Sequence, residues 1–90
     1  MYAKQSKIMN RSGLHARPAS DFVLEAKKYE SKITIRNLSH AGEAVNAKSI
    51  ARLLAEGISQ GIEIEIKAEG DDEQQAVDNL AALVATGFGE

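Results

Sequence analysis

The stretch of the chain that most clearly suggests chemistry holds a glycine, a histidine, an arginine and a proline within six residues: Gly13, His15, Arg17 and Pro18. Pro18 favours the first turn of a helix, because its φ angle is already helical and it has no N–H group to leave unpaired. The same proline biases the residue before it, Arg17, away from helical geometry. The unpaired N–H groups and the positive dipole end of a helix that begins here would favour a bound phosphate.

This local field also disfavours an imidazolium, so it predicts a neutral His15 with a free lone pair. Such a ring could attack phosphorus as a nucleophile while Arg17 neutralises the oxygens of the transferred group. A solvated helix cap beside a solvated arginine is the alternative, because short motifs occur by chance in many proteins. The residue types alone leave both interpretations open.

Composition places the chain among small globular domains. Ninety residues allow one domain, which we assign to 1–90, with one hydrophobic core. Aromatic residues make up only 4% of the chain, so the core must be aliphatic. The chain has no cysteine, and His40 is the only histidine besides His15, so we expect no metal site. The polar start of the chain and the lack of a long apolar run predict a cytoplasmic protein with no membrane partner.

The net charge of −2 is distributed unevenly. Residues 1–60 contain ten Lys or Arg against five Asp or Glu, whereas residues 61–90 contain one against eight. The acidic end argues against a general nucleic-acid binder, and the basic front suits an acidic protein partner or a phosphoryl group. Solvated surface charge remains the alternative explanation for both halves.

Hydrophobic periodicity predicts seven elements. Ala19, Phe22, Val23 and Ala26 have the spacing of one buried helical face, and the run 62–69 alternates strictly between apolar and charged residues. The expected elements are a strand at 2–9, a helix at 16–28, strands at 32–38 and 43–45, a helix from Ser49 or Ile50 to 56, a strand at 62–69 and a helix from about 71 to 85.

Turn and cap residues separate these elements. Residues 39–42 suit a hairpin turn, and Asp71 or Asp72 should cap the last helix. After that helix, Gly87 and Gly89 predict a short frayed tail. Because each predicted strand is apolar on one side only, helices must cover a single face of an open sheet. The order βαββαβα therefore predicts an α+β two-layer sandwich.

Two strings of residues carry a family resemblance. Gly13-Leu14-His15-Ala16-Arg17-Pro18-Ala19 resembles the active-site signature of HPr, the histidine phosphocarrier of the phosphoenolpyruvate-dependent sugar phosphotransferase system. Asn46-Ala47-Lys48-Ser49-Ile50 resembles the regulatory-serine region of the same family, and the likeness extends over nearly all 90 residues. The resemblance implies an open-faced sandwich of four antiparallel strands in the order 1-4-2-3 under three helices.

The resemblance also implies a function. His15 would accept a phosphoryl group from phosphorylated enzyme I and pass it to the sugar-specific enzyme IIA domains. Arg17 would stabilise the transferring oxygens, and the backbone N–H groups of Ala16 and Arg17 would hold the phosphate near the ring. The protein would be a carrier and not an independent enzyme. No cofactor is expected, because the chain has no glycine-rich nucleotide motif.

Ser49 would be a second modified residue. Its position predicts an N-cap, and the resemblance to HPr proteins of the Gram-positive type implies phosphorylation by an HPr kinase/phosphorylase and binding to a catabolite-control repressor. The fit is incomplete, because Ala51, Arg52 and Leu54 stand where the family often has methionine and glycine. The docking surface for partners would be formed by Leu24, Lys27, Lys48, Ile50, Arg52 and Leu54.

Two alternatives remain. One is a regulatory paralogue of HPr that acts mainly through phosphorylated Ser49 and not through His15. The other is a small interaction or RNA-binding domain, which would need an aromatic and basic sheet face. Glu63, Glu65 and Glu69 on the clearest strand argue against that second alternative and against direct nucleic-acid binding. We expect a monomer, because no large apolar face is left over.

Overall fold

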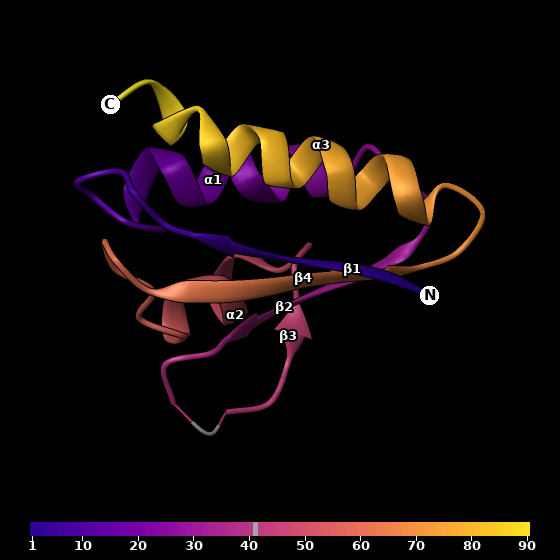
Figure 1. Ribbon diagram of the computed structural model, residues 1–90, viewed down its shortest axis with the longest axis horizontal. Helices are drawn as coiled ribbons and strands as arrows, with labels where there is room; N and C mark the ends of the chain where they lie inside the picture. Colours follow the sequence, from indigo (N-terminus) through magenta and orange to yellow (C-terminus); the bar gives the residue numbers. More distant parts are fainter. Residues whose placement is uncertain (41) are drawn as a thin grey trace.

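The computed structural model describes residues 1–40 and 42–90, which form one antiparallel sheet covered by helices (Figure 1). The strand order β1-β4-β2-β3 confirms the expected order 1-4-2-3 and the two-layer α+β class. No helix in the described part of the chain is long and apolar enough to cross a membrane. The elements are β1 (Tyr2–Lys7), α1 (Ala16–Ala26), β2 (Lys32–Asn37), β3 (Val45–Asn46), α2 (Ile50–Ala55), β4 (Glu63–Glu69), α3 (Glu73–Ala85) and a 3-10 turn, η1 (Gly87–Gly89).

The core lies between the sheet and the helices, as the alternating strands predicted. Helices α1 and α3 run along one side of the sheet, and α2 contacts α1 (Figure 1). The expected stripe of α1 is buried, and the core is aliphatic apart from Phe22, the one fully buried aromatic side chain among the described residues. Of the expected stripe of α3, only Leu83 is half-exposed. The sheet contributes Ile33, Ile35, Ile64, Ile66 and Ala68 to this core.

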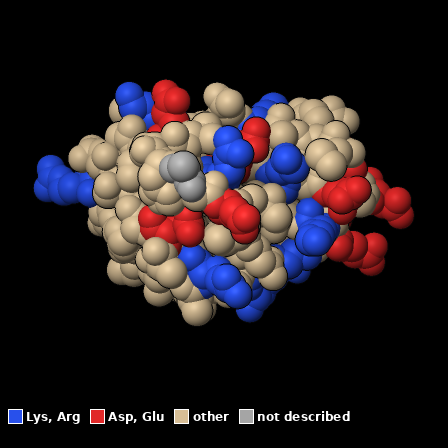
Figure 2. All heavy atoms as spheres, turned by 90° about the horizontal axis from the view of Figure 1, so that it is seen from below, with Lys and Arg blue, Asp and Glu red and all other residues tan. Residues whose placement is uncertain are grey.

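The other face of the sheet has charged residues on neighbouring strands. The register pairs Lys7 with Glu63 across β1 and β4, and it pairs Arg36 with Glu65 and Lys32 with Glu69 across β2 and β4. Opposite charges at directly paired positions stabilise a solvated sheet face. Basic and acidic side chains are likewise interspersed on the face of the molecule shown in Figure 2.

The return strand of the first hairpin begins later than the sequence suggested. We expected it at 43–45, but β3 comprises only Val45 and Asn46, paired with Ile35 and Thr34. At the end of β2, Asn37 Oδ1 accepts a hydrogen bond from the Ser39 N–H at 2.8 Å, so a side-chain turn begins the loop there. The expected turn at 39–42 includes Ala41, which lies outside the described residues.

Asp72 stands at the N-cap of α3, but its side chain does not cap that helix. Its carboxylate instead accepts hydrogen bonds from the backbone N–H groups of Glu30 at 2.9 Å and Ser31 at 3.0 Å, and also from the Ser31 hydroxyl. These bonds, with the Ser31 hydroxyl contributing most, hold the pKa of Asp72 below its ordinary value. The expected cap therefore joins the start of α3 to the loop before β2.

The tail after α3 is also ordered, which contradicts the expected frayed end. Phe88 packs partly buried against the core, and its N–H donates to Thr86 Oγ1 at 3.3 Å. The Glu90 carboxylate then reaches the loop that leads into α1. The packing of Phe88 and these hydrogen bonds hold the tail in place, although Gly87 and Gly89 favour the end of a helix.

Gly13 fixes the approach to α1 by lying against the loop before β4. A Cβ atom at this position would come within 2.6 Å of the Ile58 carbonyl oxygen and 2.7 Å of the Ser59 Cα. Its φ of +67° is also left-handed, a region in which only glycine is unstrained. Next to it, the Leu14 N–H donates to the Ile58 carbonyl at 2.9 Å. The start of α1 is therefore held at a fixed point on the neighbouring loop.

Two adjacent leucines of α2 test the position of the core. Leu53 is fully buried and Leu54 is 42% exposed. We expect Leu53→Ala to lower the free energy of unfolding by about 2 to 5 kcal/mol because it leaves a cavity, whereas Leu54→Ala should change it by about 0.5 kcal/mol or less. Urea unfolding followed by circular dichroism measures both values, and equal losses would contradict this packing.

A comparison of two left-handed glycines tests how much the close contact between Gly13 and the loop before β4 contributes to stability. Gly57 has nearly the same φ as Gly13, +62°, but a Cβ there would meet nothing within 4 Å in the described structure. Gly57→Ala should cost only the backbone strain, about 1 to 2 kcal/mol. Gly13→Ala should cost a further 1 to 3 kcal/mol or so, because the neighbouring backbone must move. Urea midpoints compare the two variants, and similar costs would show that the close approach is unimportant.

Candidate functional site

His15 occupies the N-cap of α1, two residues after Gly13, which lies against the loop before β4. Its backbone is extended, with φ −130° and ψ 163°, and its imidazole makes no capping hydrogen bond within the described residues. The side chain is half-exposed, between the buried Leu14 and the exposed Ala16. The backbone of His15 is thus fixed by its neighbours, while its ring is not used to cap the helix.

The first residue of α1 has an unusual backbone. Ala16 has φ +49°, which is left-handed and uncommon for a residue with a Cβ. Arg17 follows it inside the helix, so the bias that Pro18 imposes on the preceding residue is overridden here. The first N–H groups of a helix have no acceptor within the helix, so those of Ala16 and Arg17 are suited to an anion. Strain of this kind persists only where the surroundings over-determine it, and it is typical of functional sites.

The Arg17 side chain is nearly free in solvent. It is 90% exposed, and its Nε lies 3.9 Å from Asp21 Oδ2, one helical turn further along. An exposed ion pair at this distance contributes little to stability. The guanidinium can therefore leave Asp21 at small cost and contact another anion near the start of the helix.

Ser49 occupies the N-cap of α2, as the sequence predicted. Its Oγ accepts a hydrogen bond from the Arg52 N–H at 3.3 Å, and its side chain is half-exposed. The next residue, Ile50, is 40% exposed. Ser49 therefore combines a structural role at the helix start with access to solvent beside an exposed apolar side chain.

Three of the predicted docking residues share one groove. Leu24, Lys27 and Ile50 line a shallow depression of about 230 Å³ between α1 and α2, together with Ser20 and Val23. Leu24 is 62% exposed. On α2, Leu54 lies one turn beyond Ile50 and is also exposed, as is Arg52. The fold thus brings two distant parts of the sequence into one partly apolar surface, the α1–α2 groove.

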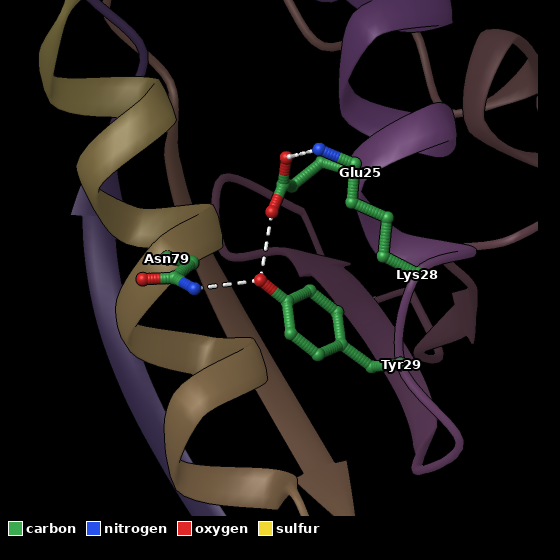
Figure 3. Close-up of polar contacts among 4 residues, drawn as sticks. All are labelled: Glu25, Lys28, Tyr29 and Asn79. Atoms are coloured by element: carbon green, nitrogen blue, oxygen red, sulfur yellow. Dashed lines mark hydrogen bonds and ion pairs between the residues drawn. The ribbon is translucent and has the colours of Figure 1, made fainter.

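The sixth predicted docking residue, Lys48, is held by the protein itself. Its Nζ donates to the Tyr29 carbonyl oxygen at 2.6 Å. The Tyr29 hydroxyl in turn donates to Glu25 at 2.7 Å and accepts from Asn79 of α3 at 2.7 Å (Figure 3). The hydroxyl of Tyr29 is the main cause of a lowered pKa at Glu25, with Lys28 adding to it. Tyr29 therefore links α1, α3 and the segment before α2.

Sequence reasoning missed one contact beside the site. Glu90 binds Ser12 and Asn10, three to five residues before His15, although 78 and 80 positions separate the partners in the chain. No local pattern signals a contact over that distance. In the part of the chain that the structure describes, no cluster of His, Asp and Glu could hold a metal ion.

Comparison with known proteins gives one consistent result. The family model "PTS HPr component phosphorylation site" matches residues 2–86. The phosphocarrier protein HPr of Haemophilus influenzae is 44% identical over 96% of this chain and 98% of its own length. A multiphosphoryl transfer protein of the same organism is 46% identical over 92% of this chain, which spans only 17% of that larger protein.

A solved structure extends the likeness to three dimensions. The crystal structure of HPr-C-His from Thermoanaerobacter tengcongensis superposes on the whole chain, and on 98% of its own, with a TM-score of 0.93 and 42% identity. Sequence and fold thus agree along nearly the full length. The chain belongs to the HPr family, the phosphocarrier proteins of the phosphotransferase system.

Proposed function

We propose that this protein accepts a phosphoryl group on His15 from phosphorylated enzyme I and passes it to sugar-specific enzyme IIA domains. The observation that carries the proposal is the His15 ring, which is half-exposed at the N-cap of α1 and makes no capping bond within the described residues. A ring in this position can meet a donor protein while the helix dipole favours a nearby phosphate.

The transfer needs no group beyond the two proteins. The lone pair of the neutral His15 imidazole attacks phosphorus, the bond from phosphorus to the donor side chain breaks, and its electron pair stays with the donor. The N–H groups of Ala16 and Arg17 and the guanidinium of Arg17 neutralise the equatorial oxygens. Attack by a second acceptor on the phosphorylated His15 reverses these roles, so the chain is a carrier and not an independent catalyst.

The α1–α2 groove is the surface that we assign to docking. Leu24 and Ile50, which line it, supply exposed apolar area, and Lys27 supplies positive charge. Leu54 and Arg52 are exposed on the same short helix as Ile50, and we include them in the docking surface. Both partners would bind this surface in turn, because it lies on the helix that begins beside His15. We further propose that the protein acts as a monomer in the cytoplasm.

Incubation with enzyme I, magnesium and phosphoenolpyruvate tests the function. We expect one acid-labile phosphate on the wild type, none on His15→Ala, and an unchanged amount on the control His40→Ala. Mass spectrometry locates the added group. A wild-type protein that takes up no phosphate from a competent enzyme I would instead support the regulatory paralogue.

In the same assay Arg17→Ala should slow transfer about a hundredfold, whereas Arg36→Ala on the sheet face should not.

We also propose that Ser49 is phosphorylated by an HPr kinase/phosphorylase, in a form that can bind a catabolite-control repressor. The half-exposed Oγ at the start of α2 supports this, because a phosphate there meets the favourable end of the helix. It would also add a charge of about −2 beside Ile50 at the edge of the groove. Little change in backbone structure is needed for such a modification to oppose docking.

Treatment with the kinase and ATP tests this regulation. Peptide mass mapping should find phosphate on Ser49, none in Ser49→Ala, and the wild-type result in the control Ser59→Ala. The modified protein should accept phosphate on His15 at least about tenfold more slowly, because the new charge lies in the docking surface. An unmodified Ser49 would exclude the proposal, and an unchanged transfer rate would exclude the inhibition.

A further inference from the structure

One carboxylate binds three donors of the turn that precedes His15. Glu90 Oε1 accepts from the Ser12 N–H at 2.9 Å and from Asn10 Nδ2 at 3.3 Å, and Glu90 Oε2 accepts from the Ser12 hydroxyl at 2.7 Å. Hydrogen bonds to an ionised acceptor are stronger than those between neutral groups. The two donors of Ser12 contribute most to a lowered pKa of Glu90, and Asn10 and Arg11 add to it. The carboxylate is therefore ionised at neutral pH.

The turn that precedes His15 makes contacts on two sides, and Glu90 provides those on one of them. On the first side, Gly13 lies against Ile58 and Ser59, and Leu14 is bonded to Ile58. On the second side, Asn10 is 3% exposed and donates to the Gly13 carbonyl at 2.9 Å, but its Oδ1 has no partner in the described structure. Without the Glu90 carboxylate, the N–H and the hydroxyl of Ser12 would both lose the acceptor that they have in this structure.

Glu90 is itself held in place by the segment before it. Phe88 packs against the core, with its backbone in the left-handed region at φ +55°, and the Glu90 N–H donates to the Gly87 carbonyl at 3.0 Å. The carboxylate is thus carried by an anchored turn. A surface depression of about 580 Å³ lies here, lined by Met9, Asn10, Arg11, Ser12, Gln60 and Glu90.

His15 follows this turn by two residues, and Ala16 must then adopt its uncommon backbone angle. A misplacement of 1 Å in a reacting group can slow a reaction about a hundredfold. We propose that Glu90 is a positioning residue for phosphoryl transfer, whose carboxylate fixes the turn through Ser12 and Asn10 so that the His15 ring is presented to the partner. This inference rests on the proposed function of His15.

Glu90→Gln tests it, with Glu69→Gln as the matched control. Glu69 is exposed at the end of β4, so the control makes the same change in charge away from the turn. Uptake of phosphate on His15 is first measured for the wild type. We then expect Glu90→Gln to lower kcat for transfer from enzyme I about tenfold with KM little changed, because the α1–α2 groove is intact. The control should match the wild type in both constants.

Two further readouts separate positioning from stability. The amide ¹⁵N–¹H signals of Ser12 and His15 should shift in Glu90→Gln and not in Glu69→Gln, and urea unfolding confirms that each variant is folded during the assay. Ser12→Ala with Glu90→Gln should slow transfer by less than the product of the single effects, because both changes break the same contact.

The outcomes are distinct. A normal kcat in Glu90→Gln overturns the inference, even if the protein is less stable, since the contact would then be only structural. A raised KM with unchanged kcat overturns it too, because Glu90 would then belong to docking. If the wild type takes up no phosphate on His15, the proposed function fails, and the role of Glu90 in transfer fails with it.

Discussion

The site depends on one close approach of backbone to backbone. Gly13 lies against Ile58 and Ser59 with no room for a Cβ atom, and the Leu14 N–H is bonded to the Ile58 carbonyl. This contact joins the loop before α1 to the loop before β4, far apart in the sequence. Because packed backbone cannot adjust continuously, it sets where α1 begins and where His15 stands. Ala16, three residues after Gly13, has a left-handed backbone at the point where the chain enters α1.

The two layers of the fold explain why His15 and the α1–α2 groove, the proposed phosphate acceptor and docking surface, lie on the helical side. The isoleucine faces of β2 and β4 must be buried, so helices cover them and leave their own outer surfaces exposed. The other sheet face has oppositely charged residues at paired positions, so this face is stable in contact with water. The start of α1 and the α1–α2 groove therefore occupy the same part of the molecule.

Side-chain carboxylates join segments that the backbone ladder does not connect. Asp72 binds the loop before β2, Asp78 of α3 accepts from the Tyr2 hydroxyl at 2.8 Å, and Glu90 binds Ser12. Each acidic residue comes from the last 20 residues of the chain, and each donor comes from the first 31. The uneven charge of the sequence thus appears in the structure partly as contacts between the two ends. An ionised carboxylate suits this role because it accepts several hydrogen bonds at once.

Hydrophobic periodicity and the sequence motifs were enough to predict the elements, the fold class and the family of this protein. The alternation at 62–69 and the stripe of α1 were enough for the elements, the class and the core, because burial of one face imposes a fixed spacing. The strings around His15 and Ser49 were enough for the resemblance to the HPr family, which the family model and the HPr relatives confirm. The limits of β3, the partner of Asp72, the ordered tail and the contact of Glu90 with Ser12 were decided only by the tertiary structure. Each of these depends on which distant group lies within hydrogen-bonding or packing distance, and no local pattern in a sequence encodes that distance.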